Sequence, residues 1–243
     1  MSEQSISFKL YEHNICTHGD APPGQGGAAG RNPERLPALI RRIKSVDSDI
    51  VVLCESNGDF AASAAAKCGY KKVFNPKTGI SELQILFKPS MFEEIKSEAH
   101  NIPGVRSHYL WVLLRPLGTD KRLLVYAYHG SLDKRTEELR EMSEISDRMG
   151  CPTIFAGDFN FSPEAIEYPA ITAKYSDASV EAASAERGST WRGWDTKGGG
   201  IIDYCFATRG DFRVNSYRVM QQVSDGVILS DHCGILTEYT LMK

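Results

Sequence analysis

The segment SDIVVLCES, residues 48–56, constrains the fold more than any other part of the chain. Its apolar run from Ile50 to Cys54 has the length of a β-strand and lacks the polar alternation of a strand that faces water on one side. Such a run is typical of a sheet that is covered on both faces, which requires further layers above and below it. The run ends at Glu55, so an acidic side chain stands where the strand stops.

Helical and strand patterns are interspersed along the chain. Helices are predicted from about residue 37, over 59–70 and over 133–149. Strands are predicted over 5–16, 48–56, 71–74, 82–88, 108–115, 121–129, 152–158, 200–208, 211–220 and 234–242. The turn signal PLGTDK lies between 108–115 and 121–129, and it predicts an antiparallel hairpin. The pattern as a whole predicts an α/β (α+β) fold, in which mixed sheets pack with helices.

The helix that begins near residue 37 has an apolar and a basic face. Its apolar positions at helical spacing are Leu39, Ile40 and Ile43. Its basic positions, which we expect to point into water, are Arg41, Arg42 and Lys44.

The composition is that of an ordinary globular protein, with 42% hydrophobic and 24% charged residues. The chain of 243 residues contains no internal repeat and no convincing linker, so one domain over 1–243 is predicted. The formal net charge of −3 argues against a strongly basic groove that clamps a duplex.

The N-terminal segment MSEQSISFKLYEHNIC is polar and alternating, unlike a signal peptide. No apolar stretch has the length needed to span a bilayer. The six cysteines include no C-x-x-C pair, which is poor spacing for a zinc or redox site. We therefore expect a cytoplasmic protein whose cysteines are reduced thiols.

Polar residues stand at the ends of many predicted strands. They are Asn14, Glu55, His129, Asp158 with Asn160, Asp203, and Asp231 with His232. In the segment PTIFAGDFNFSP, Asp158 and Asn160 are two positions apart, so on a strand their side chains point to the same face. Taken singly, each residue is explained by a turn or a solvated strand end. Together they indicate a functional site, because sites in α/β proteins form where several strand ends meet.

A Gly/Pro-rich loop, HGDAPPGQGGAAGRNP, occupies residues 18–33. It lacks the Lys-Ser/Thr pair of a P-loop and does not satisfy G-x-G-x-x-G, so it is not a recognised phosphate-binding loop. Arg31 and Arg35, at and just beyond its end, are candidate contacts to the phosphates of a polymeric substrate.

The motifs HNI, VVLCES, AYHGSL, AGDFN, IIDYCFA and LSDHCG occur here in the order seen in the endonuclease/exonuclease/phosphatase superfamily. The chain resembles this group, which includes DNase I, abasic-site endonucleases, inositol polyphosphate phosphatases and bacterial sphingomyelinases. The resemblance spans nearly the whole chain. It implies a DNase I-like four-layer sandwich, in which two packed mixed β-sheets are flanked by helices.

The resemblance also implies a role for each polar residue at a strand end. Glu55 resembles the family's metal-binding glutamate, assisted by Asn14 and Asp231, and the metal is expected to be Mg²⁺ or Mn²⁺. Asp158 resembles the carboxylate that orients or activates the attacking water. Asn160 would donate its amide N–H to a phosphate oxygen.

The remaining roles concern the histidines and the substrate. His232 with Asp203 resembles the His-Asp pair at the phosphate, and His129 resembles the second histidine of the DNase I and phosphatase branches. Abasic-site enzymes typically carry a tyrosine at the position of His129. Trp191 is a candidate for stacking on a base, although it could equally cap the core.

Four other histidines match no motif, and Glu82 is a candidate support for His129. The unmatched histidines, which we interpret as surface residues or satisfied buried residues, are His13, His18, His100 and His108.

The sequence therefore predicts a metal-dependent phosphoesterase that hydrolyses a phosphodiester, with nucleic acid as the first choice of substrate. A phosphatase or a lipid phosphodiesterase acting on a small phosphorylated substrate is the alternative, because a fold does not determine a substrate. A non-catalytic binding module of the same family ranks below both.

Overall fold

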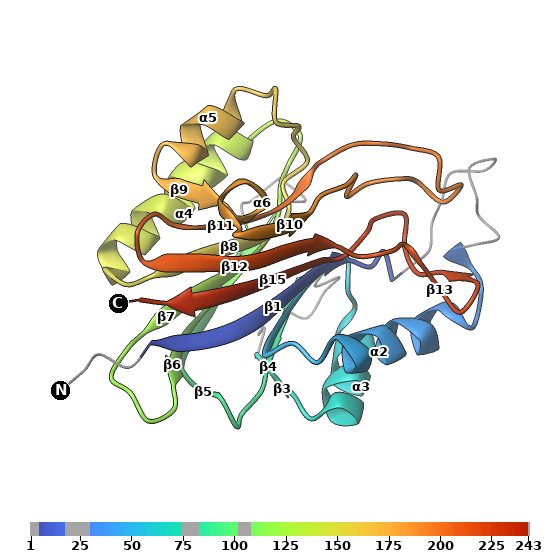
Figure 1. The fold of residues 1–243 in the computed structure, drawn as a ribbon, viewed down its shortest axis with the longest axis horizontal. Helices are drawn as coiled ribbons and strands as arrows, with labels where there is room; N and C mark the ends of the chain where they lie inside the picture. Colours follow the sequence, from blue (N-terminus) through green and yellow to red (C-terminus); the bar gives the residue numbers. More distant parts are fainter. Residues whose placement is uncertain (1–4, 18–29, 74–82, 102–107, 243) are drawn as a thin grey trace.

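The computed structural model describes residues 5–17, 30–73, 83–101 and 108–242. Two mixed β-sheets pack face to face, one of seven strands and one of six (Figure 1). The seven-stranded sheet has the order β10 (Ser184–Glu186), β12 (Phe212–Val219), β15 (Ile235–Leu241), β1 (Ile6–Asn14), β2 (Ile50–Cys54), β4 (Gln84–Phe87) and β3 (Lys71–Lys72). The six-stranded sheet has the order β5 (Phe92–Asn101), β6 (His108–Pro116), β7 (Leu123–His129), β8 (Thr153–Asp158), β11 (Asp203–Thr208) and β9 (Tyr175–Asp177).

Helices cover the outer face of each sheet. The helices α2 (Arg35–Val46) and α3 (Gly58–Cys68) pack on the seven-stranded sheet, and α4 (Arg135–Met149) and α5 (Glu167–Thr172) pack on the six-stranded sheet (Figure 1). The short helix α6 (Ala178–Glu181) and the hairpin of β13 (Val223–Ser224) and β14 (Val227–Ile228) complete the elements. The predicted four-layer sandwich is confirmed.

The strand β2 explains why the run at 50–54 is apolar at every position. Ile50, Val52 and Cys54 belong to the core between the two sheets. Val51 and Leu53 point the other way and pack under α2 and α3. Both faces of the strand are buried, as the absence of polar alternation predicted.

The hairpin of β6 and β7 is confirmed as antiparallel, with Tyr109 opposite Tyr128. The long strand β5 was not predicted. Its sequence, FEEIKSEAHN, is mostly polar because β5 lies at the edge of its sheet and pairs only with β6. The strands β9, β10, β13 and β14, of two or three residues, were also missed, since so short a segment carries no periodicity.

The helix α2 begins at Arg35, two residues before the predicted start. Arg41 and Lys44 are exposed as expected, but the prediction that Arg42 points into water is wrong. Arg42 is buried, and its guanidinium donates to the carbonyl oxygens of Gln221 at 2.9 Å and Val223 at 3.4 Å. Among the described residues, no helix is both long and apolar enough to cross a membrane.

Candidate active site

The strand pairing brings the polar strand ends together. The parallel pair β1 and β2 aligns Asn14 with Cys54, so that Glu55 follows directly beside Asn14. In the other sheet, the parallel pair β7 and β8 aligns His129 with Asp158. The antiparallel pair β8 and β11 places Asp203 opposite Asp158. The two sheets thus present these residues at one edge of the sandwich.

Asp158 is the centre of this cluster, and its carboxylate is almost completely buried. Its Oδ2 accepts a hydrogen bond from Asn14 Nδ2 at 3.0 Å, and its Oδ1 accepts one from the backbone N–H of Asn160 at 2.9 Å. The Nε2 atoms of His129 and His232 lie 3.7 and 3.8 Å from Oδ2. Burial, with a contribution from the charge of Asp203, raises the pKa of Asp158 to about 6, although the two histidines oppose the shift.

His232 and Asp203 form a buried pair. The Nδ1 atom of His232 lies 3.1 and 3.0 Å from the two carboxylate oxygens of Asp203. Burial by itself would lower the pKa of His232, but the carboxylates of Asp203 and Asp158 outweigh it and hold the pKa well above its ordinary value. The pair therefore favours an imidazolium whose Nε2 points toward Asp158.

The side chain of His13 contacts the backbone of His232. His13 is buried, its Nε2 lies 3.2 Å from the carbonyl oxygen of His232, and its Nδ1 lies 2.9 Å from the hydroxyl of Tyr11. Burial lowers the pKa of His13 to about 3, so this imidazole is neutral. The interpretation of His13 as a satisfied buried residue agrees with this geometry, and its contact with the backbone of His232 was not foreseen.

Three side chains are arranged so that they could hold a cation. Glu55, His129 and Asp158 each offer one ligand atom, and these atoms lie within 4.8 Å of one another. Two carboxylates are enough for Mg²⁺ or Mn²⁺, which keep several water ligands. The residues present therefore fit a divalent metal ion.

The other two proposed ligands are placed differently. The Nδ2 atom of Asn14 donates to Glu55 Oε1 at 2.9 Å as well as to Asp158, while its Oδ1 accepts from the backbone N–H of Cys16. Asn14 thus turns its amide nitrogen toward the carboxylates and orients them. Asp231 lies outside the cluster of three, with its Oδ1 3.2 Å from the Ser230 hydroxyl.

The backbone around the cluster is strained at three positions. The φ angles are 41° at Cys16, 50° at Glu55 and 54° at Asn160. These values lie in the left-handed region, which is unfavourable for residues other than glycine. At Gly157, which also has a positive φ, a Cβ atom would lie 1.9 Å from the carbonyl oxygen of Tyr128. The glycine of the AGDFN motif is therefore required for β7 and β8 to approach each other beside the site.

Asn160 uses part of its hydrogen-bonding capacity within the protein. Its Nδ2 donates to the carbonyl oxygen of Gly130 at 3.0 Å, and its second amide hydrogen has no partner among the described residues. The backbone carbonyl oxygen of Asn160 accepts a hydrogen bond from Arg135, which also donates to the carboxylate of Glu167. Arg135 was missed in the sequence, where it reads as one of many charged residues on an amphipathic helix.

Two buried acids near the site were missed as well. Glu138 accepts from the Tyr128 hydroxyl at 2.6 Å and from the Ser131 backbone, so α4 holds the loop after His129. Glu12 is fully buried, and neither of its carboxylate oxygens has a hydrogen-bond partner among the described residues. The only signal in the sequence is that Glu12 interrupts the apolar face of the first strand.

The residues predicted to bind the substrate differ in their exposure to solvent. The prediction that Arg35 contacts phosphates is wrong, because Arg35 is 1% exposed and its guanidinium binds backbone carbonyl groups. Arg31 is exposed. Trp191 is 39% exposed and pairs with His232 through a β-bridge, whereas Trp194 is buried. Residues 18–29, with His18, and Glu82 lie outside the described residues, and so do the side chains at 101 and 108.

Comparison with known proteins places this geometry in a family. The model of the Endonuclease/Exonuclease/phosphatase family matches residues 18–232. No curated protein sequence matches the chain.

Solved structures share the fold at low sequence identity. An endonuclease/exonuclease/phosphatase from Bacteroides vulgatus is 19% identical, with a TM-score of 0.83 over 98% of this chain and 100% of that one. The mannosyl-6-phosphatase of Bacteroides thetaiotaomicron is 17% identical, with a TM-score of 0.79 over 96% and 99%. The 2′,3′-cyclic phosphatase ANGEL2, in complex with adenosine-2′,3′-vanadate, is 15% identical, with a TM-score of 0.75 over 98% and 96%.

Because the family model covers most of the chain and the fold agrees with it, the protein belongs to the endonuclease/exonuclease/phosphatase family of phosphoesterases.

Proposed function

We propose that the protein hydrolyses a phosphoester with the help of a divalent metal ion, Mg²⁺ or Mn²⁺, by in-line attack of water on phosphorus. The observation that carries this proposal is the position of Asp158. Its carboxylate is buried and accepts hydrogen bonds from Asn14 Nδ2 and from the backbone N–H of Asn160. The Nε2 atoms of His129 and His232 both lie within 3.8 Å of its Oδ2. A carboxylate held this firmly is suited to orient a water molecule.

The metal would be held by Glu55 and Asp158, with His129 beside them and with Asn14 orienting both carboxylates. When bound, it supplies positive charge next to the phosphate oxygens. In this proposal Asp231 is a ligand only through an intervening water, since it lies outside the cluster of three.

His232 is proposed to act on the phosphate through Nε2. Its Nδ1 is committed to Asp203, which fixes the ring orientation and favours the charged form. The imidazolium would donate a hydrogen bond to a phosphate oxygen as negative charge builds there. The free amide hydrogen of Asn160 would donate to the same group.

A phosphodiester in nucleic acid remains the first proposal for the substrate. Trp191 supports it, because its β-bridge to His232 puts both side chains on the same face of the paired segments and leaves the indole exposed for a planar ring. Arg31, which is exposed, is the remaining candidate for contact with a distant phosphate.

A small phosphorylated substrate is the second candidate. Arg35 is not available to a polymer, and the formal net charge of −3 gives no general attraction to a polyanion. Both observations favour a phosphatase or a phosphodiesterase that recognises a single compact molecule.

The test is a panel of phosphoesters, namely duplex and single-stranded DNA, RNA, 2′,3′-cyclic nucleotides, sugar phosphates, inositol phosphates and sphingomyelin. Each is assayed with Mg²⁺, with Mn²⁺ and with a chelator, and the Asp158→Asn variant serves as the control for contaminating activity. Hydrolysis that needs metal and is lost in the variant supports the proposal. An absence of turnover on every substrate would favour the non-catalytic binding module.

A further inference from the structure

Arg35 is the first residue of α2, and all five of its N–H groups donate to backbone carbonyl oxygens. Nε donates to Gly30 at 3.1 Å, and Nη1 donates to Ile15 at 2.7 Å and Leu229 at 3.1 Å. Nη2 donates to Cys16 at 2.9 Å and Thr17 at 3.1 Å. One side chain therefore joins three segments that are far apart in the sequence.

Two of these segments carry residues of the proposed metal site, namely Asn14, which orients the carboxylates, and Asp231, which would bind through a water molecule. Ile15, Cys16 and Thr17 follow Asn14 directly. Leu229 stands two residues before Asp231, and the intervening Ser230 hydroxyl donates to the carbonyl oxygen of Asn14 at 2.7 Å. Arg35 thus holds Asn14 and Asp231 through the backbone on their flanks.

Glu55 is hydrogen-bonded to Thr17, one of the residues whose carbonyl groups Arg35 contacts. The backbone N–H of Thr17 donates to the carbonyl oxygen of Glu55 at 2.8 Å, and the Thr17 hydroxyl donates to the same oxygen. The hydroxyl also accepts from the backbone N–H of Asn57 at 3.1 Å. Because Glu55 has a left-handed backbone, these bonds help to keep its carboxylate turned toward Asn14.

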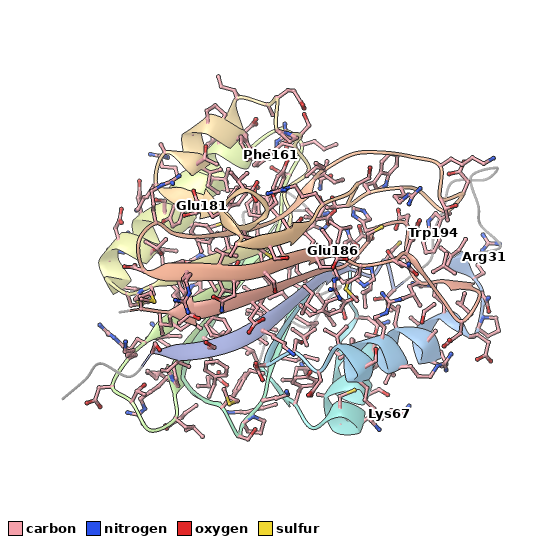
Figure 2. All side chains as sticks on the ribbon, viewed as in Figure 1. Arg31, Lys67, Phe161, Glu181, Glu186 and Trp194 are labelled. Atoms are coloured by element: carbon pink, nitrogen blue, oxygen red, sulfur yellow. The ribbon has the colours of Figure 1, made fainter. Side chains whose placement is uncertain are left out.

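The indole of Trp194 packs against the guanidinium of Arg35. The central carbon of the guanidinium lies 5.3 Å from the centroid of the indole, and Trp194 is 6% exposed and packs with Cys16. In Figure 2, Trp194 lies on the side of the molecule where α2 begins, in agreement with its contact with Arg35. Trp194 follows Trp191 by three residues, so the segment that begins at Trp191 supplies the ring that contacts the guanidinium.

Packing does not explain an arginine at this position. Burial lowers the pKa of Arg35, and no carboxylate among the described residues lies within ion-pair distance of it. A buried charge without a contacting counter-ion costs more than an apolar side chain of similar size would. Lysine has three N–H donors, without the planar geometry that reaches five carbonyl groups.

We propose that Arg35 is a positioning residue that preforms the metal site by clamping the segments that carry Asn14, Glu55 and Asp231. The inference rests on the proposed metal dependence. Arg35 touches neither substrate nor metal in this account, and it acts through the backbone of the residues beside the candidate ligands.

The chain offers a matched control in Arg42. It is also buried, lies two turns further along α2, and also donates to backbone carbonyl groups, but these belong to Gln221 and Val223. Arg35→Lys and Arg42→Lys therefore make the same chemical change on the same helix. Only Arg35→Lys removes donors to the backbone carbonyl groups beside Asn14 and Asp231.

The experiment is calorimetric titration of each protein with Mn²⁺ alone, at a temperature below every melting transition recorded by circular dichroism. We expect Arg35→Lys to bind Mn²⁺ about 10-fold or more weakly, as for other residues that orient metal ligands from outside the coordination shell. Arg42→Lys should bind Mn²⁺ like the wild type, even where its melting temperature falls as much.

The outcomes separate the two proposals. If the wild type binds no Mn²⁺, the metal-dependent function and the role of Arg35 both fail. If the wild type binds Mn²⁺ and both lysine variants bind it alike, only the role of Arg35 fails. Should Arg35→Lys not fold, Trp194→Leu, which exposes the guanidinium but keeps it, must weaken Mn²⁺ binding relative to Arg42→Lys, and an unchanged affinity would overturn the inference.

Discussion

The Nδ1 atom of His232 lies about equally far from both carboxylate oxygens of Asp203, at 3.1 and 3.0 Å. Both residues are buried, and the carboxylate raises the pKa of the imidazole against the effect of burial. A group whose pKa is raised on folding stabilises the folded protein fully below its unfolded pKa, about 6.5 for histidine, and this contribution is lost as the pH rises through the folded value.

The first prediction follows from this pair. Asp203→Asn removes the largest influence that opposes burial, so the pKa of His232 should fall, while Asp158 and Asp231 continue to raise it. Titration of the His232 Cε1–H signal by NMR, in protein treated with chelator, measures the change. A pKa of His232 that is unchanged in the variant would show that Asp203 is not the cause.

The second prediction concerns the shared centre of Asp158 and His232. Asp158→Asn and His232→Ala should each lower kcat by at least ~10², with little change in melting temperature, because both groups are proposed to act in the transition state. The double variant should lose less than the product of the two effects, since both groups serve one step. Strictly multiplicative losses would argue that the two residues act independently.

The third prediction concerns Glu55, the most exposed carboxylate of the candidate metal cluster. Glu55→Gln should weaken the activation by Mg²⁺ while keeping the fold, and higher Mg²⁺ concentrations should partly restore the rate. The measurement is the dependence of the rate on Mg²⁺ concentration. Wild-type metal dependence in the variant would remove Glu55 from the ligand set.

The fourth prediction separates a polymeric from a small substrate. If the substrate is nucleic acid, Arg31→Ala should raise KM for an oligonucleotide and make the salt dependence of kcat/KM less steep, because one phosphate contact is lost. Turnover of a small generic phosphodiester should hardly change and serves as the control. Normal cleavage of the oligonucleotide at every salt concentration would favour the small-substrate proposal.

The fifth prediction concerns the free-energy cost of burying the carboxyl group of Glu12. Burial, with the nearby charge of Asp203, raises the pKa of this carboxyl group well above its ordinary value. The unfolded chain ionises Glu12 above pH ~4.5 while the folded protein keeps it neutral, so the free energy of unfolding falls as the pH rises above that value.

Glu12→Gln removes this dependence. Urea denaturation should show the variant to be more stable than the wild type at pH 8, by on the order of 1–3 kcal/mol, and similar to it at pH 4. Equal stability at both pH values would mean that Glu12 is ionised in the folded protein and has a partner there.

Local sequence patterns predicted much of the architecture. The apolar run at 50–54 required two covered faces, and the structure buries Val52 between the sheets and Val51 beneath the helices. The two-residue spacing of Asp158 and Asn160 beside Gly157 placed a polar pair at a strand end. These features are readable because side-chain direction follows the backbone period over a few residues.

The tertiary structure alone decided the partners of the charged side chains. In the sequence, Arg35 looks like a loop residue available to a phosphate, and Arg42 looks like an exposed basic residue of an amphipathic helix. Backbone carbonyl groups of distant segments instead accept hydrogen bonds from both of them. The sequence assigns no role to His13, yet its Nε2 lies 3.2 Å from the carbonyl oxygen of His232. Burial and hydrogen bonding depend on segments up to about two hundred residues away, and local periodicity carries no information about which of those segments will meet.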